Sequence, residues 1–594
     1  MVKKYKPGVA FSEYIIKDTS SRRPRDYSLS ESSFRVNFLL LCLVLVLGIV
    51  FVRIFYLQVI RGAYYRYLSD SNRIKTIIIH SPRGIIFDRN NIPLVYNVPG
   101  FRKTVDDKTE LLSKDKALEL LAKGEKGLEI DTLREYPYKE AFAHVLGFIG
   151  QISKEELKNP LFVDYKVGDL VGKEGVEKEF EQKLKGTDGQ ELFEVDSMGK
   201  EVRRLGQSDP VPGKNVTLTI DKKLQIAAYE AMVNAKKGAV VISSPKGEIL
   251  AIVSKPSFDP NLFTMEKNYK ASSTSASLFN ILNDSENQPM LNRVIGGVYP
   301  PGSTFKLIVS AAGLEEKIID ENWEVEDTGI LKVGAFSFSN WFFTGYGRTD
   351  GFVNVIMAIK RSNDIFFYKL AEKIGINTLS KWAKDFGLGK ALGIDLPGEV
   401  SGTIPSLEWK KKVIGEQWYL GDTYHFGIGQ GYLLTTPLQV NAWTQVMANG
   451  GTLYKPQILS NQKPEVKSKN LLNEKTENLI RQGMIDACMP GGVAWPLFDF
   501  KVKNDKLKID GKNILEVPIS SGSADMRQVT VACKTGTAEH GDTAKTTPHA
   551  WITLFAPAFD PQIVVTVLVE ESGEGSNIAA PIAKKILESY FSSK

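Results

Sequence analysis

The chain has 594 residues, of which 43% are hydrophobic and 24% are charged. This length gives room for several domains and a large buried core, and the composition is ordinary for a globular protein with one short membrane anchor. The net charge of +6 is small for this length and gives no case for a nucleic-acid partner.

The N-terminal region predicts a single membrane anchor. Residues 1–35 carry eight Lys or Arg against four acids, which predicts a basic tail that stays in the cytoplasm. Residues 36–52 carry no charge, and the apolar stretch continues past Arg53, so residues 36–60 are long enough to cross a hydrocarbon core of roughly 30 Å. A cleaved signal peptide is the alternative, but the stretch is long, no small-residue cleavage site follows it, and a long polar segment precedes it. We therefore expect a single-pass protein of the cytoplasmic (inner) membrane, with everything after residue 60 on its extracytoplasmic face.

The exported part divides into two domains. Residues 61–207 mix short strands with charged helices and contain no catalytic cluster, and residues 208–215, SDPVPGKN, read as a Pro/Gly-rich linker. Residues 216–594 predict an α+β domain with an antiparallel sheet flanked by helices. Its predicted elements are a strand at 215–221, a helix at 222–235, a hairpin at 237–257 that turns at Pro245-Lys246-Gly247, strands at 550–558 and 563–572, and a helix at 580–591.

The first chemical motif is Ser303-Thr304-Phe305-Lys306. Gly302 and two preceding prolines end any earlier element, and the apolar run that follows predicts a helix with Ser303 at its N-terminus. Lys306 then lies one turn later on the same face. A helix N-terminus and a desolvated pocket both disfavour an ammonium ion, so Lys306 is a candidate base for the serine proton. Taken alone, Ser303 would more often be a helix cap than a nucleophile.

Two later motifs favour Ser303 as a nucleophile over Ser303 as a helix cap. Ser362-Asn363-Asp364 begins or lines an apolar helix that ends near Ile374, which places the Ser362 hydroxyl to relay a proton. Lys534-Thr535-Gly536-Thr537 follows an alternating segment that starts at Val529 and predicts a strand. There Gly536 lets a substrate backbone lie close, while Lys534, Thr535 and Thr537 are candidates to hold a carboxylate. We expect Asp364 to lie near Lys306 and Lys534.

S-x-x-K, a later S-x-N/D and a K-T-G in this order are the signature of serine acyl-enzymes that react with penicillin. The chain resembles the class B penicillin-binding proteins, which are membrane-anchored D,D-transpeptidases. The resemblance extends upstream to two segments like the family's stalk, or pedestal, motifs: residues 80–100, with Arg83 and Asp88, and residues 172–189, with Glu177. Residues 254–261 and 426–439 match signatures within its transpeptidase domain.

The resemblance implies a function and a site. It implies that residues 61–207 are a dimerisation-type pedestal and that Ser303 attacks the stem peptides of peptidoglycan during crosslinking, with β-lactams as covalent inhibitors. It implies an oxyanion hole made by the backbone N–H groups of Ser303 and Thr537, and no cofactor. Because no glycosyltransferase-like segment lies between anchor and linker, we expect a separate multi-span membrane glycosyltransferase as partner.

Other interpretations stay open at this point. Ser362-x-Asp364 followed by Phe-Phe-Tyr is more like the elongation-type members, which maintain cell shape, than the division-type septal ones. A D,D-carboxypeptidase or β-lactamase, and a non-catalytic β-lactam sensor, are weaker alternatives, since the chain keeps all three motifs, an anchor and a stalk. No metal-ligand spacing occurs. A Cys488–Cys533 bridge stays open, although the pattern favours Cys533 as a small buried strand residue.

Overall fold

The computed structural model describes residues 32–105, 108–125, 127–196, 198, 200–264, 277–517, 526–541 and 546–593. Residues 1–31, most of the predicted basic tail, lie outside the described residues. The chain forms two compact units: residues up to 77 together with 191–207, and residues 78–190 together with 208–594. The domain limits expected from the sequence stay predictions.

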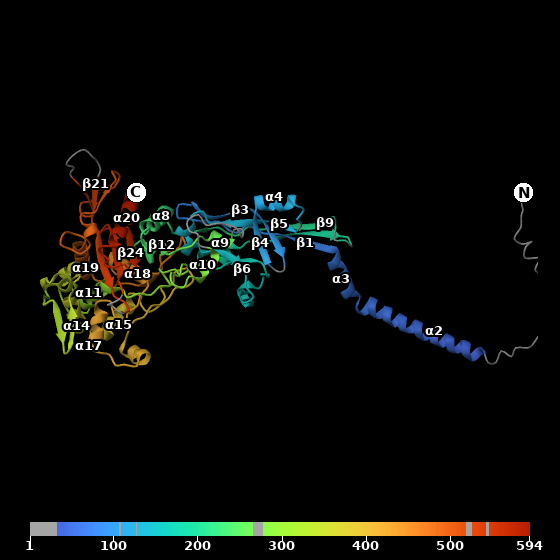
Figure 1. Cartoon of the computed structure of the whole chain (residues 1–594), viewed down its shortest axis with the longest axis horizontal. Helices are drawn as coiled ribbons and strands as arrows, with labels where there is room; N and C mark the ends of the chain where they lie inside the picture. Colours follow the sequence, from blue (N-terminus) through green and yellow to red (C-terminus); the bar gives the residue numbers. More distant parts are fainter. Residues whose placement is uncertain are drawn as a thin grey trace, which may run out of the picture. The chain divides into compact units, whose positions relative to one another are not determined.

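The first unit carries the predicted anchor. Helix α2 (Ser32–Phe55) continues through a π-helical turn, η1 (Tyr56–Ile60), and α3 (Gly62–Arg73) follows (Figure 1). The segment Phe34–Ile60 has a mean hydropathy of 3.0 in its most apolar window and is long enough to cross a membrane. A sheet with the strand order β1-β8-β9 comes next along the chain, formed by β1 (Ile74–Ile79), β8 (Gly189–Val195) and β9 (Glu201–Ser208).

The second unit begins with a pedestal sheet. Its strand order is β10-β2-β3-β4, and β5 pairs with β3. These strands are β2 (Ile86–Phe87), β3 (Pro93–Val105), β4 (Lys108–Ser113), β5 (Leu128–Glu135) and β10 (Val216–Thr217). Smaller pedestal elements are α4 (Lys114–Ala122), α5 (Ala143–Leu146), β6 (Ile149–Gln151), β7 (Leu170–Gly172), α6 (Gly175–Glu179) and α7 (Glu181–Leu184).

A buried ion-pair network ties the pedestal together. The fully buried Glu177 carboxylate accepts a hydrogen bond of 2.7 Å from Arg83 Nε and another of 2.7 Å from Arg134 Nε. Arg83 also donates to Glu181 through Nη2, at 2.6 Å. Arg83 and Glu177 belong to the two stalk motifs quoted from the sequence, so these distant motifs meet in one charge cluster. Because a buried charge is costly unless it is paired, removal of either partner would destabilise the pedestal.

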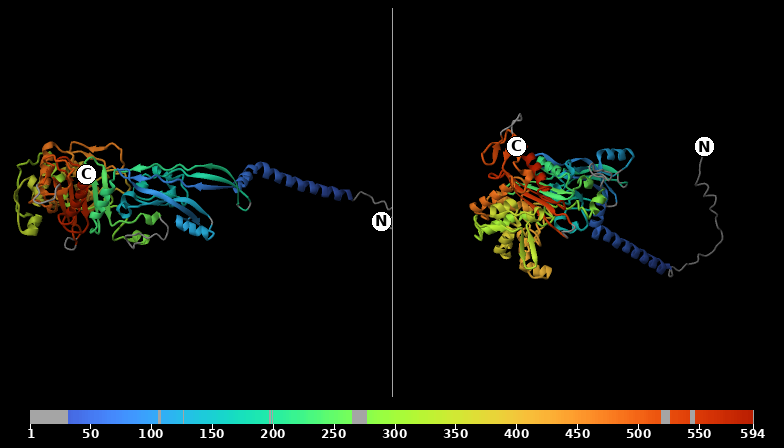
Figure 2. Two further views of the ribbon diagram at one scale, coloured as in Figure 1. Left: turned by 90° about the horizontal axis from the view of Figure 1, so that it is seen from above. Right: turned by 60° about the vertical axis from the view of Figure 1, so that its left-hand side comes forward.

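The C-terminal domain is built on an antiparallel sheet with the strand order β12-β11-β24-β23-β22. The strands are β11 (Gly238–Ser243), β12 (Ile249–Lys255), β22 (Ala532–Ala538), β23 (His549–Ala556) and β24 (Ile563–Val569). Helices α8 (Lys222–Ala231) and α20 (Ala579–Ser592) lie side by side and pack on this sheet (Figures 1 and 2). Helix α18 (Pro437–Ala448) packs on its other face. The predicted α+β architecture is confirmed.

Local sequence explains two of these elements. The β11–β12 hairpin turns at Gly247, whose φ of +90° favours glycine, as the predicted Pro-Lys-Gly turn requires. Helix α18 begins with a capping box, in which the Thr436 side chain accepts from Gln439 N and the Gln439 side chain accepts from Thr436 N. Pro437 occupies the first turn, where its missing N–H costs nothing.

A helical region lies beside the sheet and carries two of the three motifs. Its helices are α11 (Lys306–Glu315), α13 (Val355–Arg361), α14 (Asp364–Ile374), α15 (Ile376–Asp385), α17 (Leu420–Gly427) and α19 (Glu474–Ala487). The remaining elements are α9 (Asn261–Thr264), α10 (Leu278–Asn283), β13 (Val325–Asp327), β14 (Ile330–Val333), β15 (Phe336–Ser339), α12 (Trp341–Tyr346), β16 (Gly351–Val353), α16 (Leu407–Trp409), β17 (Leu453–Tyr454), β18 (Val466–Ser468), β19 (Lys501–Lys503), β20 (Ile514–Glu516) and β21 (Met526–Val529).

Candidate active site

The first motif lies where a tight turn enters α11. Ser303 is in a 3-10 turn, η5 (Gly302–Thr304), and α11 starts at Lys306, so the predicted helix begins three residues later than the serine. Gly302 has a φ of +53°, and a Cβ there would lie 2.9 Å from Thr537 O. Only glycine allows the turn to approach β22 this closely. Ser303 is partly exposed, whereas the Lys306 side chain is fully buried.

The second motif forms the junction between two helices. Ser362 ends α13 in the left-handed region, with φ 55° and ψ 38°. Asn363 then caps α14, because its Oδ1 accepts from Phe366 N at 3.0 Å. The expected helix from this motif to Ile374 is confirmed, and the abrupt junction turns the Ser362 side chain towards the two motif lysines.

The third motif is the outer strand of the described central sheet. Residues 529–537 were expected to form one strand, but β21 ends at Val529 and pairs within a separate sheet of order β19-β21-β20, while β22 starts at Ala532. Thr530 causes the break, because its N donates to Asn513 O and its carbonyl accepts from Ala558 N, outside either sheet. The Thr537 side chain is exposed on β22, whereas Thr535 is buried.

The three motifs meet through the two lysines. Lys534 Nζ donates to Ser362 Oγ at 2.8 Å and to Thr535 O at 2.9 Å. Lys306 Nζ donates to Ser362 O at 2.8 Å and lies 3.4 Å from Ser362 Oγ. The Ser362 hydroxyl therefore bridges two fully buried lysines from segments far apart in the sequence. Lys534 was expected to help hold a carboxylate, and that role stays a prediction.

Asp364 contacts one of the two lysines directly. Its Oδ1 lies 2.6 Å from Lys306 Nζ, and its Oδ2 accepts from Trp341 N at 2.9 Å. Asp364 was expected close to Lys306 and Lys534, and the structure places its direct ion pair at Lys306. A backbone N–H and an ammonium group together satisfy the carboxylate in a buried site.

Burial controls the charge of both lysines. It lowers the pKa of Lys306 below the usual value, and the nearby Asp364 carboxylate opposes this shift. Burial and the positive charge of Lys306 lower the pKa of Lys534 well below its usual value. A lysine with a lowered pKa can be neutral near physiological pH, so each amine is suited to accept a proton.

Gly536 lies against the turn that carries Ser303. A Cβ at this position would lie 3.2 Å from Pro301 O and 3.2 Å from Thr304 Cγ2. The missing side chain therefore makes room for the turn that carries Ser303, and the expected approach of a substrate backbone to Gly536 stays a prediction. Gly302 and Gly536 together allow η5 and β22 to pack at close range.

A disulfide lies directly behind the third motif. Cys488, at the C-terminal end of α19, and Cys533, on β22, are bonded to one another. The sequence favoured Cys533 as an unbonded buried residue, and only its burial is correct. Sequence spacing gives no sign of this pairing, because α19 and β22 approach one another only in the folded domain.

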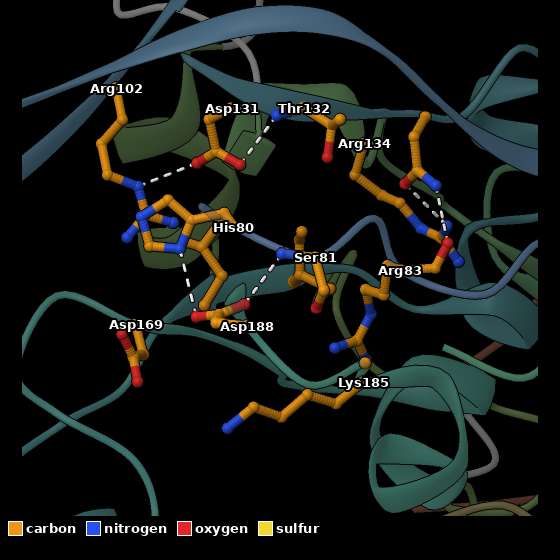
Figure 3. A pocket seen from close by; sticks show the side chains of 14 residues that line it. His80, Ser81, Arg83, Arg102, Asp131, Thr132, Arg134, Asp169, Lys185 and Asp188 are labelled. Atoms are coloured by element: carbon orange, nitrogen blue, oxygen red, sulfur yellow. Dashed lines mark hydrogen bonds and ion pairs between the residues drawn. The ribbon is translucent and has the colours of Figure 1, made fainter. Parts of the chain in front are cut away.

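The pedestal has a separate polar pocket of about 80 Å³. Its polar side chains contact one another, since Arg102 Nε donates to Asp131 at 2.8 Å and His80 Nδ1 lies 3.3 Å from Asp188 (Figure 3). None of the three catalytic motifs lines it. Within the described residues, no group of three or more His, Cys, Asp or Glu side chains is placed to hold a metal ion.

Comparisons with known proteins agree with this site. Residues 238–588 match the family model described as the penicillin binding protein transpeptidase domain, and residues 126–218 match the penicillin-binding protein dimerisation domain. The chain is 32% identical to peptidoglycan D,D-transpeptidase MrdA of Acinetobacter baumannii, over 94% of this chain and 87% of that protein.

Solved structures give the same result. A complex between penicillin-binding protein PBP2 and MreC from Helicobacter pylori contains a chain 29% identical to this one, with a TM-score of 0.71 and coverage of 88% of this chain and 99% of that one. A solved structure on the structural coordination of polymerization and crosslinking by a peptidoglycan synthase complex contains a chain that is 26% identical to this one, with a TM-score of 0.70 and coverage of 94% of this chain and 99% of that one. Because the transpeptidase model matches more than half of the chain and the similarity to MrdA covers nearly all of it, this protein belongs to the class B penicillin-binding proteins, in their elongation-type group.

Proposed function

We propose that this protein crosslinks peptidoglycan during cell elongation, with Ser303 as the nucleophile of a D,D-transpeptidase. The observation that supports this most strongly is the bridge from Lys306 through the Ser362 hydroxyl to Lys534, next to the turn that carries Ser303. A hydroxyl between two buried amines is a short path for protons. A serine acyl-enzyme needs such a path twice, once for acylation and once for transfer to the acceptor.

Acylation starts at Ser303. Neutral Lys306 takes the hydroxyl proton as Ser303 Oγ attacks the carbonyl carbon of the penultimate D-Ala. The negative oxygen of the tetrahedral intermediate is held by the backbone N–H groups of Ser303 and Thr537. The C–N bond then breaks as the proton that Lys306 took passes through the Ser362 hydroxyl, which also contacts Lys534, to the departing D-Ala amine, and an ester to Ser303 remains.

Transfer reverses the proton path. The acceptor amine of a neighbouring stem peptide attacks the ester carbon and its proton passes through the Ser362 hydroxyl to Lys306. The bond from the acyl carbon to Ser303 Oγ then breaks, the crosslinking amide forms, and Lys306 returns the proton to Ser303. β22 is the outer strand of the described sheet, so an extended peptide can pair with its free edge. Thr537 is exposed there and reaches the bound peptide, whereas Thr535 and Lys534 support the site from inside. A β-lactam acylates Ser303 in the same way and stays attached.

The anchor places this chemistry outside the cytoplasm. Phe34–Ile60 spans the inner membrane once, and the basic residues before it stay inside. The crosslinking enzyme needs glycan strands, and we assign their supply to a multi-span membrane glycosyltransferase. The similar chain in a complex described as coordinating polymerization and crosslinking supports this partner.

The test uses the full chain in detergent or liposomes, together with a peptidoglycan polymerase and lipid-linked disaccharide-pentapeptide. We expect crosslinked muropeptides with release of D-Ala, and none with Ser303→Ala or after penicillin. Release of D-Ala without crosslinks would indicate a carboxypeptidase, and no release by the wild-type protein would contradict the proposal.

A further inference from the structure

Ser362 is held in a backbone conformation that its residue type disfavours. Its φ of 55° and ψ of 38° are in the left-handed region, which is sterically unfavourable for a non-glycine residue. Such a conformation persists only where the surroundings enforce it. At this position it directs the Ser362 hydroxyl to Lys534, 2.8 Å away.

One carboxylate contacts the residues on both sides of Ser362. Asp350 Oδ1 accepts from Arg361 Nε at 2.9 Å, and Asp350 Oδ2 accepts from Asn363 Nδ2 at 3.1 Å. The Asp350 side chain is only 5% exposed, so these contacts are weakly screened by solvent. Asp350 thus binds the side chains of the residues directly before and directly after Ser362.

A second carboxylate, that of Asp327, holds Asp350 in place. Asp327 Oδ2 accepts from Asp350 N at 2.9 Å and from Asn363 Nδ2 at 2.9 Å, and also from Asn340 Nδ2 at 2.7 Å. Asp327 Oδ1 accepts from Gly329 N at 2.9 Å, so four donors surround this buried side chain. Asp327 therefore joins the loop before β16 to the junction between α13 and α14.

The same network reaches the ion pair of the other lysine. Asn340 Oδ1 accepts from Asp364 N at 3.2 Å, and the next residue, Trp341, donates its backbone N–H to Asp364 Oδ2. Asn340 is fully buried. The segment from Asp327 to Asp350 thus contacts the backbone beside Ser362 and the carboxylate that pairs with Lys306.

We infer that Asp350, supported by Asp327, is a positioning residue for the acylation reaction: it holds Ser362 in its left-handed conformation and keeps the hydroxyl in line between the two lysines. It touches neither substrate nor reacting atoms and acts only through Ser362. The inference rests on the proposed serine acyl-enzyme function. No sequence motif marks it, because Asp327, Asn340 and Asp350 precede the S-x-D motif without regular spacing.

The experiment is a double-mutant cycle on the full-length protein, with benzylpenicillin acylation measured by stopped flow. We expect Asp350→Asn to lower the acylation rate constant about tenfold while the dissociation constant of the non-covalent complex changes by less than about twofold. In the Ser362→Ala background, Asp350→Asn should have little further effect, since the group that it positions is gone. Asp395→Asn, which removes a carboxylate from an ion pair with Lys455 in the same domain, is the matched control and should acylate normally.

The possible outcomes distinguish failure of the positioning role of Asp350 from failure of the proposed function. An equal tenfold loss in both backgrounds, or no loss in Asp350→Asn, would overturn the positioning role. If Asp350→Asn does not fold, Arg361→Gln removes the other partner of the same ion pair from a partly exposed position and must give the same pattern in the cycle. Absence of acylation in the wild-type protein would contradict the proposed function instead, and is thereby distinguished from failure of this inference.

Discussion

Lys306 Nζ lies 2.6 Å from Asp364 Oδ1 at the centre of the site. Two opposing effects act on the Lys306 amine: burial favours its neutral form, and the Asp364 carboxylate favours its charged form. The pKa of Lys306 is lowered on balance, which leaves a base whose strength depends on its neighbour. Asp364 therefore tunes Lys306 through a direct ion pair, and its charge also opposes the lowering of the Lys534 pKa.

Asp364→Asn tests this tuning. The change removes the charge and keeps the size, so the pKa of Lys306 falls further because the effect that raised it is gone. The acid limb of kcat/KM for acylation should therefore move to lower pH, while the rate at neutral pH changes tenfold or less, about 1.4 kcal/mol. Stopped-flow acylation across the pH range measures both. An unchanged profile would remove Asp364 from the tuning of the base.

Lys306→Arg separates a base from a fixed charge. Arginine keeps the positive charge but cannot release its proton at accessible pH. We expect the acylation rate to fall by roughly a hundredfold or more, the usual contribution of a positioned base. The exposed Lys501→Arg serves as the control and should acylate at the wild-type rate. Near-normal acylation by Lys306→Arg would show that this lysine acts only as a charge.

The disulfide should support the strand that carries Lys534. Cys488 and Cys533 are separated by 45 residues, and closing a loop of that length stabilises a domain by about 4 kcal/mol in the chain-entropy model. The double variant Cys488→Ala/Cys533→Ala should therefore unfold at lower temperature and lower denaturant concentration. Thiol counting before and after reduction of the wild-type protein checks the bond itself. Equal stability of the two proteins, with the bond present in the wild type, would contradict this role.

His144 should make the pedestal side of the fold sensitive to acid. Burial lowers its pKa from 6.5 to about 4 while Nε2 bonds to Pro289 O at 2.8 Å. Between pH 6.5 and pH 4 the unfolded chain binds a proton at this histidine and the folded chain does not. The free energy of unfolding is therefore unaffected above pH 6.5 and decreases as the pH falls towards 4. The loss is about 3 kcal/mol. The free energy of unfolding of His144→Gln, measured with denaturant at several pH values, should not show this decrease. A decrease identical to that of the wild-type protein would exclude His144 as its source.

Much of the fold and the site follows from local sequence. The hairpin that turns at Gly247 and the helix capped by Asn363 are encoded by neighbouring residues, so periodicity and turn chemistry predict them. Ser303, Lys306, Ser362 and Lys534 are recognisable because the reaction requires these residue types in short motifs.

What could not be predicted depends on contacts between distant segments. The bridge from Ser362 to both lysines, the choice of Lys306 as the direct partner of Asp364 and the bond to Cys533 arise only when helix and strand pack together. The break between β21 and β22 was missed because the backbone of Thr530 forms hydrogen bonds with loop residues and not with a neighbouring strand. The alternation of apolar and polar residues carries no information about such contacts. The close approach of the Ser303 turn to Gly536 was missed for the same reason, since the two segments are far apart in the sequence.

The most direct measurement is intact-mass analysis of the purified protein after incubation with benzylpenicillin. The account predicts one covalent adduct on the wild-type chain, located at Ser303 by peptide mapping, and no adduct on Ser303→Ala, since loss of a nucleophile removes several powers of ten in rate. Ser310→Ala, which changes a serine on the following helix α11, should keep the adduct. An unchanged adduct on Ser303→Ala would contradict the account.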